Sequence, residues 1–435
     1  IDLSATLIGR VLTHPVCVVA LKAVTLALFV VTILAGLIGD QNPYRNIAPT
    51  LVWIVWWVGL AYVAAFVGDQ WALVNPWRTA FDGARWLAGR GGASSGYRAY
   101  PPALGVWPAC LLLLGFAWLE LVYPYAATPA HIAGFAMAYS VLTFAGMATF
   151  GRDAWLGHGE VFSVFFSTFA RFAPTEVRGG RLWLRPFAAG LREARPVSPS
   201  MMAFVLLMLA TVLYDGLTGT GEWAALEGFL RGVWPGPNAK AGPAIATIGL
   251  LAFWLLFLGA YLGICAAMSR LAGGQLGTLE VGRRFTLSLI PIAIGYHVAH
   301  YLVFLLVQGQ YIIPLLSDPF GYGWDLFGTA GYRVDIAIAG ARFAWYAALG
   351  AIVAGHVLAV YLAHLRAMTV FAPSRVAFAT QVPMTVLMVL YTFVGLSIAA
   401  EPITESRSAA EPVVATGQVV VPSDALHPDA LAGHP

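Results

Sequence analysis

Charged residues are scarce in this chain of 435 residues. Only 10% of the residues are Asp, Glu, Lys or Arg, whereas 59% are hydrophobic. Soluble domains carry about 25% charged residues, and the mean hydropathy of this chain is +0.76. The composition therefore excludes an ordinary soluble protein and indicates an integral membrane protein.

Cysteine and several catalytic motifs are also scarce or missing. The three cysteines all lie in apolar runs, at Cys17, Cys110 and Cys265, so they give neither a disulfide framework nor cysteine-type metal spacing. The sequence has no Walker-type phosphate loop and no HExxH zinc motif, and its one GxSxG match, GASSG at residues 92–96, lies in a Gly- and Ser-rich stretch with no hydrophobic strand before it. ATP-driven transport and serine hydrolysis on this chain are therefore unsupported.

Long apolar runs are what the sequence has in abundance. Crossing a bilayer core of ~30 Å takes about 20 helical residues. We expect nine spans, at about residues 16–39, 48–69, 103–125, 130–150, 199–215, 243–268, 285–307, 339–365 and 378–400. The fifth is the shortest. The pattern predicts an all-α fold, a polytopic transmembrane helix bundle that occupies residues 1–400 as one domain.

The cationic residues predict which connections face the cytoplasm. The N-terminal end, the Arg-rich loops 70–102 and 151–198, and the shorter loops 269–284 and 366–377 hold 18 of the 24 Lys and Arg residues. By the positive-inside rule these segments are cytoplasmic. Nine spans then place the N-terminus in the cytoplasm and the C-terminus outside. The expected location is a bacterial inner (plasma) membrane.

Three segments outside the spans have their own character. Residues 161–172 are aromatic and too short to span, so they predict an interfacial or re-entrant helix. The arginines of 178–195 either contact anionic lipid head groups or serve only to set the topology, and no motif for nucleic acid accompanies them. Residues 401–435 predict a flexible extracytoplasmic tail. Because the chain begins at Ile1 rather than Met, we expect that a signal peptide or another earlier segment preceded it.

Three histidines in the last third of the chain are the main chemical signal. His297 and His300 lie one helical turn apart, and His356 lies on the next span. At about 1.5 Å of rise per residue, His297 lies about 20 Å from Arg284 and His356 about 15 Å from Arg366. Since consecutive spans are usually neighbours, we expect these histidines at similar depth near the middle of the membrane.

This histidine cluster leaves three interpretations open. A haem b could be held between His297 and His356 as axial ligands, in a haem- or copper-binding anchor of a redox complex. A divalent metal ion could be bound by His297, His300 and His356 together with Asp335. Alternatively, the histidines form hydrogen bonds that only stabilise helix packing.

The connection 308–338 favours a site on the outer side. It is long, rich in glycine and aromatic residues, and apolar for an aqueous loop, so we expect it to fold as a lid over its flanking helices. Arg333 and Arg342 bracket Asp335 in sequence. They offer a clamp for a phosphate or carboxylate, or else an Arg–Asp pair that only fixes the loop.

A proton-coupled transporter is a further hypothesis. Glu120 ends the third span and His131 begins the fourth, so the two could form a proton relay or simply cap helix ends. The histidines, Glu120 and Lys22 would then line the path. Lys22 argues against this, because it lies near the cytoplasmic end of its helix and can extend its ammonium group to the interface.

Longer stretches resemble one family. The runs IGYHVAHYLVFLLVQGQYIIPLLSDPFGYGWDLFGTAGYRVDI and GARFAWYAALGAIVAGHVLAVYLAH, together with WALVNPWRT, GVWPACLLLLGFAWLELVYP and LYDGLTGT, resemble a bacterial family of integral membrane proteins known as fenitrothion hydrolases. The resemblance covers most of residues 50–370, including the histidines and the acidic residues of the 308–338 loop. Family members also tend to have an additional extracytoplasmic segment and span before the region that begins here at Ile1.

The resemblance implies a membrane-bound enzyme that hydrolyses organophosphate triesters. Such hydrolysis usually needs a metal ion that generates hydroxide and polarises the P=O group. The implied ligands are His297, His300, His356 and Asp335, with Arg333 or Arg342 near the leaving group. The expected partners are membrane lipids and other membrane or periplasmic subunits.

Overall fold

The computed structural model describes residues 1–89 and 96–405, which are mostly helical. Nine helical segments in this part of the chain are long and apolar enough to cross a membrane. They are Pro15–Ile38, Ile47–Phe66, Pro102–Leu121, Pro129–Phe150, Pro199–Thr218, Lys240–Leu271, Thr278–Ser317, Ala341–Val370 and Ser374–Ile398. The prediction of a helix bundle with nine spans is therefore confirmed for the described residues, and the chain is a multi-pass membrane protein.

The fifth span is one of the most enclosed. Helix α11 (Pro199–Thr218) has buried side chains along most of its length. It packs on α7 (Trp107–Leu121), α13 (Asn238–Leu271) and α15 (Ile290–Gln308). A helix surrounded by other helices can include polar residues that a helix facing lipid cannot. The hydrophobic run of α11 is therefore short in sequence.

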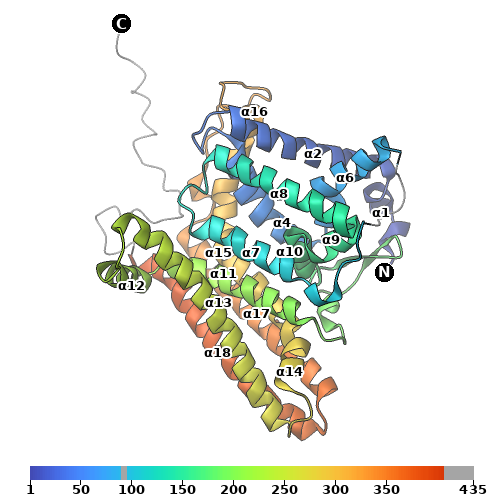
Figure 1. Cartoon of the computed structure of the whole chain (residues 1–435), viewed down its shortest axis with the longest axis vertical. Helices are drawn as coiled ribbons and strands as arrows, with labels where there is room; N and C mark the ends of the chain where they lie inside the picture. Colours follow the sequence, from blue (N-terminus) through green and yellow to red (C-terminus); the bar gives the residue numbers. More distant parts are fainter. Residues whose placement is uncertain (90–95, 406–435) are drawn as a thin grey trace.

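The remaining long helices lie on either side of this centre. Helices α2 (Pro15–Ile38) and α8 (Pro129–Phe150) run side by side along one edge of the molecule, and α13 runs beside α18 (Ser374–Glu405) along the opposite edge (Figure 1). Helix α17 (Ala341–Val370) packs against both α15 and α18. The second span combines α3 (Ile47–Pro49), the π-helix η2 (Thr50–Gly59) and α4 (Leu60–Phe66).

Other short elements lie in the connections or at the ends of the spans. These are η1 (Leu3–Ala5), α1 (Leu7–Leu12), α5 (Trp71–Val74), α6 (Pro76–Leu87), η3 (Pro102–Leu104), α9 (Arg152–His158), η4 (Ala189–Arg192), α12 (Gly221–Gly232), α14 (Thr278–Phe285), η5 (Thr286–Leu289), η6 (Gly309–Tyr311), α16 (Ile312–Ser317) and η7 (Ile336–Ile338). The predicted loop 70–102 thus contains two helices, and its residues 90–95 lie outside the described part of the chain.

The aromatic segment predicted as interfacial or re-entrant is a buried helix. Helix α10 (Val161–Ala170) has eight buried residues and packs against α4, α5, α7 and α9. Its side chains Phe162, Phe165 and Phe166 contact the indole rings of Trp56 and Trp57. Ten residues span about 15 Å, so α10 is a short helix held inside the bundle by aromatic packing.

The fold is mostly helical, as predicted, and the described residues add one small β-hairpin that the prediction did not include. Strands β1 (Thr175–Arg178) and β2 (Arg181–Leu184) form an antiparallel hairpin in the Arg-rich loop. Its turn residues, Gly179 and Gly180, have φ values of 58° and 75°, a conformation that glycine adopts without steric cost. Asp2 pairs with Trp183 in an isolated bridge and with Arg181 in an ion pair of 3.3 Å.

The 308–338 connection folds differently from the predicted lid. After α16 the backbone lies on the turn between α2 and α3, where the amide of Asp40 donates to the Phe320 carbonyl (2.8 Å) and that of Ile47 donates to the Pro319 carbonyl (3.1 Å). The connection therefore covers the start of the second span rather than only its own flanking helices. Of the predicted tail 401–435, residues 401–405 continue α18, and 406–435 lie outside the described residues.

Candidate functional site

His297 lies in the middle of α15 and is buried. Its Nε2 lies 3.4 Å from the Val58 carbonyl oxygen of the π-helix η2. A carbonyl only accepts, so Nε2 carries the proton of this bond. The ring also contacts the rings of Tyr62, Phe169 and Tyr301, with centroid separations of 5.3, 5.8 and 4.9 Å. His297 thus faces η2, α4 and α10.

His300 lies one turn further along α15 and lies within hydrogen-bond distance of an acid that the sequence analysis did not single out. Its Nε2 is 2.8 Å from Oδ2 of Asp215 on α11. The Tyr301 hydroxyl donates to the same oxygen at 2.9 Å. Both the Asp215 and the His300 side chains are only partly exposed, at 24% and 31%. The His300 imidazole and the Tyr301 hydroxyl therefore both lie within hydrogen-bond distance of the same Asp215 oxygen, in the membrane-spanning part of the bundle.

His356 on α17 points to a different side of α15 from His297. It contacts the rings of Tyr296 and Tyr391, the latter on α18. Its Nδ1 lies 2.8 Å from the Ile352 carbonyl oxygen and must donate to it. Its buried Nε2 then carries a lone pair, and no hydrogen-bond partner for it lies among the described residues.

Helices α15 and α17 are in backbone contact at the level of these histidines. A methyl group added at Gly295 would lie 2.6 Å from the Ala351 carbonyl oxygen, and one added at Gly355 would lie 2.5 Å from the Pro291 carbonyl oxygen. Helices this close leave no space for a porphyrin between them. The haem between His297 and His356 stays a prediction that would require the two helices to separate.

The remaining predicted residues lie apart from the histidines. Asp335 caps η7 by accepting from the Ala337 amide (2.9 Å), and its own amide donates to Gln310 (2.9 Å). Arg333 and Arg342 are exposed, and neither guanidinium forms an ion pair within residues 1–89 and 96–405. The predicted Arg–Asp335 pair is therefore not formed among the described residues.

The predicted metal ligands do not converge on one point. His297, His300 and His356 have separate partners, and Asp335 caps a short helix. In the part of the chain that the structure describes, no three His, Cys, Asp or Glu side chains are arranged so that they could hold a metal ion. The four-ligand site stays a prediction to which this arrangement adds no geometric support.

Glu120 and His131 also have separate partners. Glu120 Oε1 accepts from Nε1 of Trp57 on η2 at 3.0 Å, whereas His131 Nδ1 lies 3.4 Å from the Tyr123 hydroxyl. Glu120 instead lies within electrostatic range of the Asp215 carboxyl group, so we group it with Asp215 and not with His131.

Four residues therefore form an intramembrane polar cluster: Glu120, Asp215, His300 and Tyr301. They come from α7, α11 and α15, near the ends of α7 and α11 that the charge pattern predicts to be extracytoplasmic. The π-helix η2 borders the cluster through Trp57. π-helices are rare in proteins, and those that occur are often found at functional sites.

Another acid, Glu160, is buried and has a structural role that its position explains. It precedes α10 and is fully buried. Its carboxylate caps the helix by accepting from the amides of Phe162 (3.0 Å) and Ser163 (2.8 Å). It also accepts from the Ser163 hydroxyl, Tyr139, Trp71 and Asn75. Six donors, and no ion pair with a cation among the residues that the structure describes, make this group an anchor for α10.

A usable signal for the missed acid was present in the sequence. Asp215 lies in LYDGLT, at the end of an apolar run, and an acid inside a span is a functional candidate by default. Its partner His300 is 85 residues away, so no local pattern joins the two.

Comparison with models of known protein families, with curated proteins and with solved structures gives no match to this chain.

Proposed function

We propose that this chain carries protons within the membrane through the intramembrane polar cluster, as the proton path of a transporter. The observation that carries the proposal is the pair of Asp215 and His300, which joins two central spans by a contact of 2.8 Å. Ionisable groups inside a membrane are costly and typically mark ion paths and proton relays.

The chemistry of the cluster suits proton exchange. Asp215 Oδ2 is within hydrogen-bond distance of both His300 Nε2 and the Tyr301 hydroxyl. A proton can therefore pass between the acid and the imidazole without a large movement of either helix. Imidazole exchanges protons near neutral pH more readily than any other side chain, and Glu120 supplies a second acid nearby.

Further polar groups continue from the cluster toward the middle of α15. The Tyr301 ring contacts the His297 ring, and the Tyr62 hydroxyl lies 3.4 Å from the carbonyl oxygens of His297 and Val298. We propose that this line is the inward continuation of the path. With the N-terminus in the cytoplasm of a bacterial cell, the cluster would open toward the outer side of the inner membrane.

Proton flux into liposomes tests this proposal. The purified chain is reconstituted in liposomes that contain a pH-sensitive dye, and a potassium diffusion potential drives protons inward. We expect acidification faster than in empty liposomes, and we expect Asp215→Asn and His300→Gln each to reduce it to the empty-liposome rate. Glu227→Gln is the control, since Glu227 pairs with Arg231 on the connecting helix α12. Flux that is unchanged in Asp215→Asn would contradict the proposal.

A second candidate function, binding of a metal or haem, is favoured by one observation. His356 donates from Nδ1 to a backbone carbonyl and keeps a buried lone pair on Nε2, which is the usual arrangement of a histidine that ligates a metal. Organophosphate hydrolysis, which the family resemblance implies, would need such a metal. His356 would be one ligand, and other ligands would have to move toward it.

Elemental analysis distinguishes this candidate from the first. Iron, copper, zinc and manganese are measured in the detergent-purified chain, and His356→Ala is compared with His364→Ala. His364 Nδ1 lies 2.8 Å from Gln381 Oε1, so His364 is a paired histidine on the same helix. Metal lost only in His356→Ala supports the second candidate, and no metal in the unaltered chain contradicts it.

A further inference from the structure

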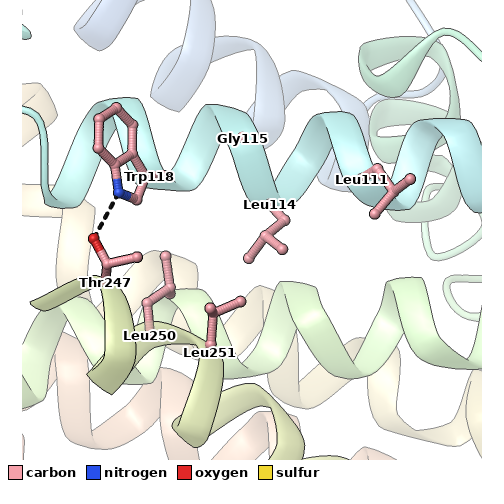
Figure 2. A pocket seen from close by; sticks show the side chains of 7 residues that line it. All are labelled: Leu111, Leu114, Gly115, Trp118, Thr247, Leu250 and Leu251. Carbon is pink, nitrogen blue, oxygen red and sulfur yellow. Dashed lines mark hydrogen bonds between the residues drawn. The ribbon is translucent and has the colours of Figure 1, made fainter. Parts of the chain in front are cut away.

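An apolar cleft separates α7 from α13. Both helices pack on α11, and between them lies a cavity of about 290 Å³. Figure 2 shows the two walls, with the side chains of α7 facing those of α13 across the cleft. The lining residues are Leu111, Leu114, Gly115, Trp118, Thr247, Leu250 and Leu251.

The cleft offers an occupant almost only apolar contacts. Its two polar side chains satisfy each other, because Trp118 Nε1 donates to the Thr247 hydroxyl at 2.9 Å. Leu111 and Leu251, on opposite walls, are 63% and 40% exposed, so the cleft opens sideways on the surface of two spans. In a bilayer this surface faces lipid tails.

Lys240 lies on the same face of α13 as the cleft, nearer to the N-terminal end of this helix. Lys240 is exposed, and within the described residues its ammonium group forms no ion pair. Thr247 and Leu251 follow it by seven and eleven residues, and both spacings return to nearly the same helix face. At about 1.5 Å per residue, Lys240 lies about 10 Å beyond Thr247. A phospholipid has a similar distance between its phosphate group and the part of its acyl chain nearest the headgroup.

We propose that this cleft binds one acyl chain of an anionic phospholipid whose phosphate group contacts Lys240. The apolar walls suit the chain, and the lysine together with the positive N-terminal end of α13 suits the phosphate.

Filling the cleft tests the acyl-chain part of the proposal. A Cβ added at Gly115 meets no atom within 4 Å, and the same holds for Gly259, which is exposed on α13 but does not line the cleft. The full chain is analysed by native mass spectrometry after incubation with phosphatidylglycerol or phosphatidylcholine. We expect a retained phosphatidylglycerol that Gly115→Phe removes and Gly259→Phe keeps. Equal retention in the two variants overturns the site.

The two lysines test the headgroup part. Lys240→Gln should lower phosphatidylglycerol retention about fivefold, as expected for one lysine near an anionic lipid, and leave phosphatidylcholine unchanged. Lys22→Gln, which removes the only other lysine, should change neither. A phospholipid with a photoreactive acyl chain should label residues 111–118 or 247–251. Cross-links between two copies at α7 and α13 would instead assign the cleft to a dimer and overturn the proposal.

Discussion

The imidazole of His300 and the carboxylate of Asp215 meet at 2.8 Å although 85 residues separate them in the chain. The contact joins α11 to α15, two helices that pack against each other at the centre of the bundle. Tyr301, the next residue on α15, donates to the same oxygen. The pair is therefore both a link between central spans and the chemical centre of the proposed proton path.

The Asp215–His300 pair should be measurable as a coupling energy. We expect Asp215→Asn and His300→Gln each to lower the free energy of unfolding, and the double variant to lower it by roughly 1–2 kcal/mol less than the sum. The reason is that each single variant leaves the other group without its partner. Unfolding in mixed detergent micelles measures all four corners of the cycle. Strict additivity would show that the pair contributes no interaction energy.

The contact between α15 and α17 should not tolerate a methyl group. Gly355→Ala would place a carbon 2.5 Å from the Pro291 carbonyl oxygen, and we expect a loss of about 1–3 kcal/mol from overpacking. Gly350→Ala on the same helix meets no atom within 4 Å. It should raise stability by up to about 1 kcal/mol, since alanine favours a helix over glycine. Thermal unfolding of the two variants gives the comparison, and equal midpoints would contradict the backbone contact.

Glu160 should be required as a carboxylate. Glu160→Gln turns an amide NH₂ toward donors that need an acceptor, including the Ser163 amide and the Tyr139 hydroxyl. We expect a loss of about 2–3 kcal/mol, which corresponds to unsatisfied buried donors. The exposed pair of Glu227 and Arg231 gives the control Glu227→Gln, with an expected effect of less than about 1 kcal/mol. Chemical unfolding followed by tryptophan fluorescence measures both, and an unchanged Glu160→Gln would contradict the capping role.

Asn46 should hold the turn on which residues 318–322 dock. Its buried Nδ2 donates to the carbonyl oxygens of Ala35 (2.7 Å) and Asp40 (2.8 Å). Asn46→Ala removes both bonds, so the amides of Asp40 and Ile47 should exchange hydrogen faster. Asn42→Ala, at an exposed position in the same turn, should leave these rates unchanged. Hydrogen–deuterium exchange resolved by peptide tests this difference.

Parts of the site were predictable and parts were not. His297, His300 and His356 stand out in sequence because histidine is rare inside a span, and their depths follow from helical rise. Their partners do not follow. His297 and His356 lie on neighbouring helices, yet their rings face different neighbours. Depth fixes only one of three coordinates, and the rotation of each helix about its axis fixes where a side chain points.

By itself, the sequence determined that this is a multi-pass membrane protein, and it located the nine spans to within a few residues at most ends. Hydropathy is a sum of local transfer free energies, so it needs no knowledge of neighbouring helices. The tertiary structure decided that Asp215 pairs with His300, that Glu160 caps a helix inside the bundle, and that α15 touches α17 at Gly295 and Gly355. These features depend on the packing of segments far apart in the chain, which no local window of residues contains.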